Sequence, residues 1–144
     1  MASVAHLFRA LKKHSAMAEL DSVKVLQDRG FADCAHGRAG SKRQVLLVDK
    51  ETLDAMNLQP GILRENITTI GLNVNGLTIG ERLRIGLALL EVSAVCTPCD
   101  QLERIRPGLR REIYGRRGML CRVLEGGRIR TGDTIERLAL AASA

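Results

Sequence analysis

Two cysteines separated by two residues form the segment of the chain best suited to thiol or metal chemistry. The sequence Cys-Thr-Pro-Cys-Asp occupies positions 96–100, between an apolar run of strand length and a segment with helical periodicity. A thiol at the start of a helix lies at the positive end of the helix dipole, which favours the thiolate. We therefore expect Cys99 to act as a nucleophile or as a ligand for a soft metal. The alternation of the preceding strand predicts that Cys96 points into the core.

Two other uses of these thiols stay open. A Cys-x-x-Cys pair could be a redox dithiol, although no strand-helix-strand pattern surrounds it. A zinc site would need two further ligands, such as Cys34, His36 or Cys121, and their spacings match no familiar zinc finger.

A second candidate segment is the glycine-flanked loop around His36. Residues 33–38 place a carboxylate, a thiol, an imidazole and a guanidinium close together, which suits either a binding site or a solvated loop. Downstream, Ser41-Lys42-Arg43 is either an anion-binding loop or a solvated one. His36 and Arg43 are therefore candidate binding residues.

A third candidate segment begins at Arg64 and ends at Thr69. It carries a guanidinium, the side-chain amide of Asn66 and the hydroxyl of Thr68 beside an apolar residue, Ile67. These groups could bind a polar heterocycle or a phosphate, or they could hold a turn through Asn and Thr side chains.

Short strands must position these residues. Apolar or alternating runs predict strands at 22–26, 44–48, 82–85 and 88–95. Asn75-Gly76 predicts a tight hairpin turn within 73–78, because both central positions of such a turn need positive φ. Glycine-rich segments at 126–127 and 131–133 predict a further short pair, which brings the expected count to seven or eight strands.

Helices are expected in three places. Asp100 is a plausible N-cap for a helix that ends at Pro107, and a second short helix is expected from Pro107 to about Tyr114. Another should begin near Glu51, with apolar side chains pointing inward at Leu53, Met56 and Leu58. The first residues fit either a helical stripe or an initial strand. Many short strands with brief helices favour a mainly β fold, a small closed β-barrel, since closure removes exposed sheet edges.

Length and charge narrow the class of protein. The chain has 144 residues and a formal net charge of +6, and we expect one domain over 1–144 with its core at about 22–136. No apolar run is long enough to span a bilayer, and the order of charges at the N-terminus is wrong for a secretory signal, so we expect a cytoplasmic protein with free thiols and no membrane partner.

The positive charge also allows a nucleic-acid-binding module, but only three aromatic residues are present to stack on bases. Arginine supplies 17 of the 22 basic residues, which suits bidentate recognition of phosphate or carboxylate at a defined site. The pairs Arg110-Arg111 and Arg116-Arg117 form either a solvated face or, if they fold over the mouth of the barrel, an attractor of anionic ligands.

Taken in order, these motifs resemble the MOSC domain family, the module also found at the C-terminus of molybdenum cofactor sulfurases and in amidoxime-reducing proteins. The resemblance extends over roughly 23–135 and rests on His36-Gly37, Ser41 to Val45, Arg64 to Thr69, Gly80 to Leu83, Pro98-Cys99, Arg117 to Met119, Gly127 and Gly132-Asp133. One position departs from the pattern, since Cys34 stands where many members have an acidic residue.

The resemblance implies a barrel of the type seen in pyruvate kinase that binds molybdenum cofactor, or molybdopterin. It implies that Cys99 ligates molybdenum or carries sulfur for it. It also implies that His36, Arg43, Arg64, Asn66 and Thr68 contact or frame the pterin and its phosphate.

Two activities follow from the resemblance. The protein could reduce N-hydroxylated compounds, and it would then need partner proteins, because the chain has no iron-sulfur motif and no flavin or nicotinamide fingerprint. Alternatively, it could be a non-catalytic carrier of the cofactor or of sulfur, with a persulfide on Cys99 and partners in cofactor biosynthesis. The sequence is consistent with both a molybdenum-dependent oxidoreductase and a sulfur or cofactor carrier.

Overall fold

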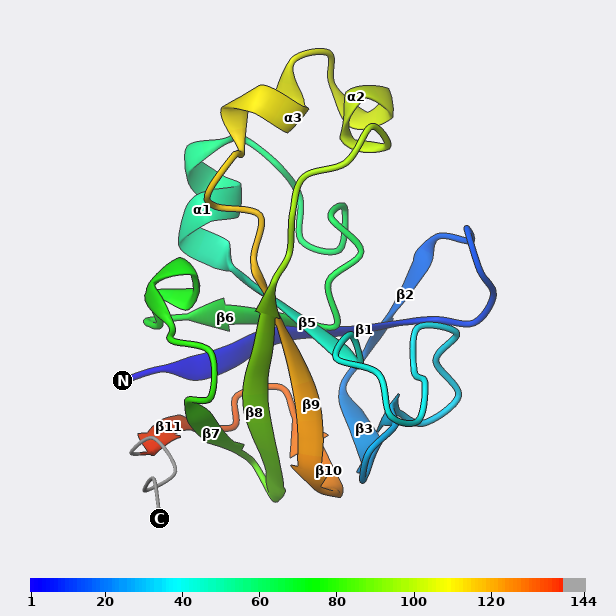
Figure 1. Cartoon of the computed structure of the whole chain (residues 1–144), viewed down its shortest axis with the longest axis vertical. Coiled ribbons are helices and arrows are strands. Elements are labelled where there is room, and N and C mark those ends of the chain that lie inside the picture. Colours follow the sequence, from blue (N-terminus) through cyan, green and yellow to red (C-terminus); the bar gives the residue numbers. More distant parts are fainter. Residues whose placement is uncertain (139–144) are drawn as a thin grey trace.

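The computed structural model describes residues 1–138, which form a mainly β fold with three short α-helices (Figure 1). The strands are β1 (Ser3–Ala10), β2 (Met17–Leu20), β3 (Ser22–Leu26), β4 (Gly30–Phe31), β5 (Val45–Asp49), β6 (Ile67–Ile70), β7 (Arg82–Ile85), β8 (Ala88–Val95), β9 (Met119–Glu125), β10 (Gly127–Arg130) and β11 (Ile135–Leu138). The helices are α1 (Lys50–Ala55), α2 (Leu102–Ile105) and α3 (Leu109–Glu112), with a 3-10 turn η1 at Val74–Gly76. No helix in this part of the chain is long and apolar enough to cross a membrane.

The strands form two sheets rather than the closed barrel expected from the sequence. The larger sheet has the order β11-β7-β8-β9-β5-β6-β1-β2, and the smaller one has the order β10-β3-β4. Within residues 1–138 the end strands β11 and β2 do not pair, so the larger sheet stays open. The chain passes from the larger sheet to the smaller one at Asp21, between β2 and β3, and again at Gly126, between β9 and β10. The mainly β class is confirmed, and barrel closure is not.

The two sheets nevertheless enclose one apolar core. Val23, Val25 and Ile129 of the smaller sheet belong to the same buried cluster as Leu83 and Leu90 of the larger one. Backbone hydrogen bonds join the sheets at their corners, for example from Asp28 N to Val123 O at 2.9 Å. The inner faces of the two sheets therefore bury their apolar side chains against each other, although the larger sheet is not closed.

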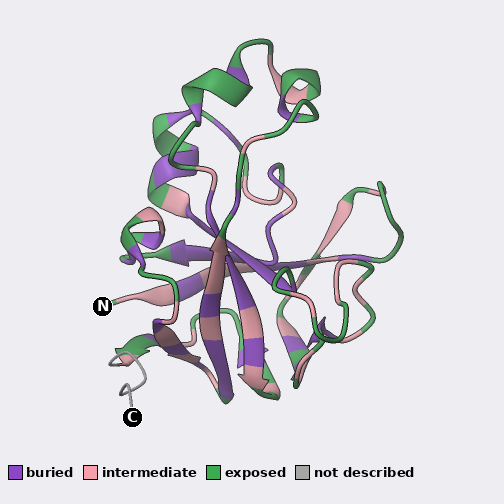
Figure 2. Ribbon diagram, viewed as in Figure 1, coloured by how far each residue is buried: buried purple, intermediate pink, exposed green. Residues whose placement is uncertain are grey.

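A second core lies on the other side of β5. Because side chains alternate along a strand, Val45 and Leu47 face the first core, whereas Leu46 and Val48 face a cluster formed with α1, α2 and α3. All residues of β5 are buried, as Figure 2 shows for the centre of the sheet. The three helices lie together at one end of the molecule (Figure 1).

Most local predictions are confirmed. The four expected strands correspond to β3, β5, β7 and β8, and the three expected helices to α1, α2 and α3. Leu53, Met56 and Leu58 are buried, and the ambiguous first residues form β1. The described residues contain eleven strands, which is more than the seven or eight expected.

Three local predictions are wrong. Asn75-Gly76 lies in the 3-10 turn η1 rather than in a hairpin, and neither residue has positive φ. The two C-terminal strands do not pair with each other, because β10 pairs with β3 and β11 with β7. The N-cap of α2 is Gln101, while the carboxylate of Asp100 accepts a hydrogen bond from Arg110.

Candidate functional site

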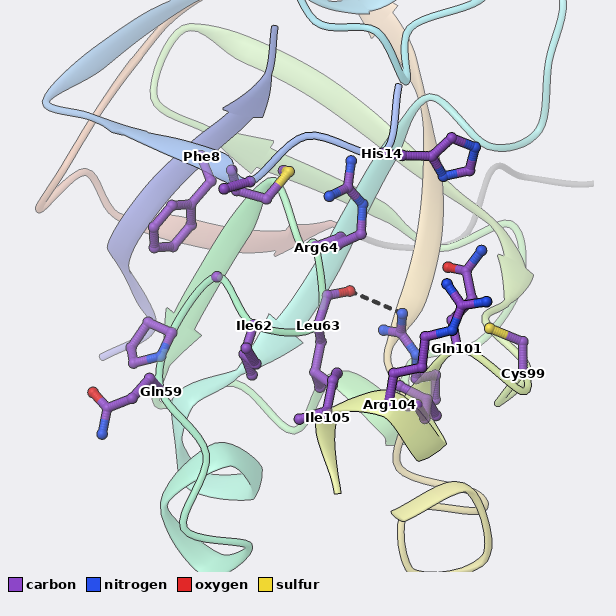
Figure 3. Close-up of a pocket in the computed structure, with 16 residues that line it drawn as sticks. Phe8, His14, Gln59, Ile62, Leu63, Arg64, Cys99, Gln101, Arg104 and Ile105 are labelled. Carbon is purple, nitrogen blue, oxygen red and sulfur yellow. Dashed lines mark hydrogen bonds between the residues drawn. The ribbon is translucent and has the colours of Figure 1, made fainter. Parts of the chain in front are cut away.

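A cavity of about 450 Å³ opens beside the helical end of the molecule (Figure 3). Its volume falls within the range usual for sites that bind small molecules or cofactors. Four segments line it: the end of β1 and the β1–β2 loop, residues 59–64, the stretch from Cys99 through α2, and Arg117.

The chain leaves and re-enters the larger sheet at one point, which brings Cys99 and Arg117 to the same cavity. Val95, the last residue of β8, pairs with Met119, the first residue of β9. The segment between them forms α2 and α3 and packs onto the second core through Leu102, Leu109 and Ile113. Cys99 therefore follows a paired strand and Arg117 precedes one, and both side chains line the cavity.

Cys99 differs from the other three cysteines in its exposure. Cys99 is exposed, whereas Cys96 and Cys121 are buried and Cys34 is partly buried. The prediction that Cys96 lies in the core is confirmed. Complete burial raises the pKa of the Cys121 thiol far above its ordinary value, which keeps that thiol protonated. Helix α2 has only four residues, so exposure into a cavity, rather than a long helix dipole, distinguishes Cys99.

Arg64, Arg104 and Arg117 line the cavity, and no Asp or Glu of residues 1–138 does. Among the described residues, none of the three forms an ion pair, whereas Arg106 and Arg110 on the adjacent helical segment pair with Glu112 and Asp100. The positive charge of the lining arginines is therefore not neutralised within this part of the protein, which favours an anionic ligand.

Arg117 also carries hydrogen-bond donors that have no acceptor in the part of the chain that the structure describes. Its Nη2 donates to the carbonyl oxygen of Leu63 at 2.8 Å, drawn as a dashed line in Figure 3. Its Nε and Nη1 are buried and have no partner among the described residues. Buried donors are almost always satisfied in folded proteins, so this guanidinium lacks the acceptor that an anionic ligand would supply.

The rest of the cavity wall is apolar. Phe8, Met17, Ile62, Leu63 and Ile105 contribute to it, together with Pro60 and Leu102. In Figure 3, Cys99, Gln101 and Arg104 lie on one side of the cavity, and Phe8 and Gln59 lie on the opposite side. A ligand with an anionic group and an apolar or aromatic body fits this distribution of side chains.

The predicted site residues fall into two groups. Cys99 and Arg64 line the cavity, while His36, Arg43, Asn66 and Thr68 do not. His36 nevertheless lies next to the cavity, since its Nε2 is 3.2 Å from Nη2 of Arg64. Arg43 is exposed on the neighbouring loop.

Asn66 and Thr68 are buried and hold the loop that carries Arg64. The Asn66 side chain accepts from Leu46 N at 3.0 Å and donates to Phe8 O at 3.3 Å. Thr68 donates from Oγ1 to Glu65 Oε2 at 2.9 Å, and that same carboxylate oxygen accepts from Gly61 N at 2.8 Å. These contacts fix the backbone of residues 61–66, and Arg64 adopts a left-handed φ of 62° within it.

The sequence does not predict several residues that line the cavity, namely His14, Gln101, Arg104 and the apolar residues of the wall. The sequence places Arg117 in a cationic stretch and in a motif of the MOSC resemblance, but does not predict it as a binding residue. Of the four described arginines in that stretch, Arg117 lines the cavity and the other three do not. The motif from Arg117 to Met119 was the signal in the sequence, since Arg117 lies two residues before β9, which pairs with the strand leading to Cys99.

The chain belongs to the MOSC domain family, whose pattern it matches over residues 34–136. This family is associated with binding of the molybdenum cofactor. No curated protein matches the chain.

Solved structures share the fold. The YuaD protein of Bacillus subtilis is 22% identical, with a TM-score of 0.76 and coverage of 94% of each chain. YiiM of Geobacillus stearothermophilus is 18% identical, with a TM-score of 0.78, over 96% of this chain and 76% of the other. YiiM of Escherichia coli is 18% identical, with a TM-score of 0.73, over 99% and 70%.

Proposed function

We propose that the protein binds molybdenum cofactor in this cavity and that the Cys99 thiolate is a ligand of molybdenum. The observation that carries the proposal is the combination of one exposed thiol with three arginines that have no ion-pair partner among the described residues. A thiolate is a soft ligand, and guanidinium groups suit the phosphate of a pterin.

The residues of the cavity fit such a group. The buried, unpartnered Nε and Nη1 of Arg117 call for an acceptor, and Arg64 and Arg104 add positive charge beside it. When bound, the cofactor would supply the dithiolene ligands and the redox chemistry of molybdenum. Arg117 would bind its anionic part, the apolar wall would exclude water from its ring system, and Cys99 would hold the metal.

The described residues contain no cluster of three His, Cys, Asp or Glu side chains able to hold a bare metal ion. A zinc site of protein ligands therefore has no support in this part of the chain. One thiolate is sufficient only if the ligand brings its own donor atoms, as a dithiolene does.

The test is measurement of molybdenum by elemental analysis, together with fluorescence of the oxidised pterin, on protein purified anaerobically from a host that makes the cofactor. Wild type should retain both. Cys99→Ser should lose molybdenum, and Cys96→Ala, which alters a buried thiol outside the cavity, should retain it. Equal molybdenum in wild type and Cys99→Ser would contradict the role of Cys99.

Within this function we propose reduction of N-hydroxylated compounds as the activity. Such a reaction takes two electrons and two protons, breaks the N–O bond, and releases the amine and water. The apolar wall beside Cys99 offers room for an organic substrate, and the electrons would come from a partner protein that donates them. Sustained reduction of a hydroxylamine by the loaded protein with an artificial electron donor would support this activity. Cofactor binding without turnover would instead favour a carrier of cofactor or of sulfur.

A further inference from the structure

Arg64 is held in the cavity wall by two acceptors that carry no charge. Its Nη1 donates to the carbonyl oxygen of Ser15 in the β1–β2 loop, and its Nη2 lies 3.2 Å from Nε2 of His36. A guanidinium has only N–H donors, so Nε2 of His36 must present its lone pair. The proton of the neutral ring therefore sits on Nδ1.

We propose that His36 is a positioning residue, which fixes Arg64 as a neutral acceptor and so leaves the full positive charge of the guanidinium available to an anionic ligand. The anionic ligand itself rests on the proposed function. His36 does not line the cavity and acts only through Arg64.

The chemistry of the acceptor decides how much charge the cavity retains. Arg106 and Arg110 are held by the carboxylates of Glu112 and Asp100, which neutralise them. Arg64 has no carboxylate partner within residues 1–138. Its hydrogen-bond partners are a carbonyl oxygen and an imidazole nitrogen, whereas those of Arg106 and Arg110 include carboxylates. A carboxylate at position 36 would provide the same hydrogen bond but would cancel the charge.

The surroundings of His36 keep its ring neutral. Partial burial, followed by the positive charges of Arg64 and Arg43, lowers the pKa of His36 below its ordinary value near 6.5. Arg64 reaches it from the loop before β6, and Arg43 from the loop before β5. The contact is thus complete at neutral pH, and it is lost as the pH falls through the lowered pKa, because a protonated ring cannot accept from Arg64.

Nuclear magnetic resonance of the ligand-free protein tests this arrangement directly. The chain has three histidines, and the spectrum of His36→Gln identifies the signals of His36 by their loss. We expect neutral His36 to be the Nδ1–H tautomer and to titrate below 6.5, and we expect Arg64→Met to raise its pKa. An Nε2–H tautomer in wild type, or an unchanged pKa in Arg64→Met, would overturn the proposal.

The second readout is the molybdenum retained by two variants of His36, whose new side chains are equal in size but differ in charge. His36→Gln keeps a neutral acceptor, whereas His36→Glu introduces a charged one. At pH 7.5 we expect His36→Gln to retain molybdenum at close to the wild-type level and His36→Glu to bind it about tenfold more weakly, with similar melting temperatures. Equal retention in His36→Glu and wild type, or equal loss in both variants, would overturn the proposal. If wild type itself holds no cofactor, the proposed function fails, while the tautomer and pKa of His36 still decide its role.

Discussion

The backbone amide of Cys96 donates to the carbonyl oxygen of Gly118 at 3.0 Å, at the point where β8 and β9 leave the larger sheet. This hydrogen bond closes the base of the segment that contains α2 and α3. It holds together the two ends of this segment, one of which lies near Cys99 and the other near Arg117. The sheet therefore determines which thiol and which guanidinium share the cavity.

Gly118→Ala should destabilise the protein and displace Arg117. Gly118 has a φ of 114°, and a Cβ there would lie 2.4 Å from the carbonyl oxygen of Leu47. We expect a loss of about 3 kcal/mol in the free energy of unfolding, as for other overpacked positions. Gly40 is the control, since it also has positive φ but no atom of the described residues lies within 4 Å of the position its Cβ would take. Gly40→Ala should cost about 1 kcal/mol, and chemical denaturation that gave equal losses would contradict the steric argument.

Arg117→Met should reduce retention of the cofactor by about tenfold or more while the protein stays folded. The substitution removes the unpartnered donors and the bond to Leu63, of which the bond alone contributes about 1 kcal/mol to stability. Arg116→Met is the matched control, because Arg116 is exposed and does not line the cavity. Molybdenum content measured on both variants checks the prediction, and equal content would remove Arg117 from the site.

Cys99 should be the thiol that reacts first with a disulfide reagent in the native protein. It is exposed, whereas Cys96 and Cys121 are buried and the pKa of Cys121 is raised by burial. We expect about one fast-reacting thiol per chain, absent in Cys99→Ser, and all four thiols after unfolding in guanidinium. A fast phase of the same amplitude in Cys99→Ser would show that another cysteine is accessible.

Elements with a strong local pattern could be predicted from the sequence, and tertiary contacts explain the failures. The run at 44–48 reads as a buried strand because β5 is covered on both faces. The prediction of a hairpin at Asn75-Gly76 is wrong because the Asn75 side chain forms hydrogen bonds with two other segments of the chain. Its Nδ2 donates to Asp49 Oδ1 at 3.3 Å, and its Oδ1 accepts from Gly118 N at 3.1 Å. No local turn rule contains those partners.

Residue types predicted two of the side chains that line the candidate site, but not how the side chains are arranged. Cys99 and Arg64 stand out by chemistry and by motif, and both line the cavity. The same motif contains Asn66 and Thr68, which the fold uses to hold the backbone of the Arg64 loop. Arg104 and Arg117 lie in an arginine-rich segment. The spacing of its arginines does not predict which of them form ion pairs and which line the cavity.

The ion pair between Glu81 and Arg137 makes stability depend on pH in the acid range. Arg137 of β11 donates from Nε and Nη2 to the Glu81 carboxylate, the latter at 2.9 Å, and Glu81 also accepts from Thr78 N at 3.2 Å. The hydrogen bond from Arg137 contributes most to holding the pKa of Glu81 below its usual value, while burial opposes it. The pair fastens β11, the edge strand of the larger sheet, to the segment just before β7.

A carboxyl group with a lowered pKa stabilises the folded state above its unfolded pKa, near 4.3, and this contribution is lost as the pH falls through the folded pKa. Arg137 is half exposed, so solvent screening limits the effect, and we expect Glu81→Gln to cost about 1 kcal/mol at pH 7. The difference between wild type and variant should shrink as the pH is lowered from 5 to about 3. Lys50→Met, which removes an exposed pair with Asp54, is the control and should change stability by less than about 0.5 kcal/mol. Urea denaturation across this range measures both variants, and a difference for Glu81→Gln that stays constant with pH would show that its carboxylate charge does not stabilise the fold.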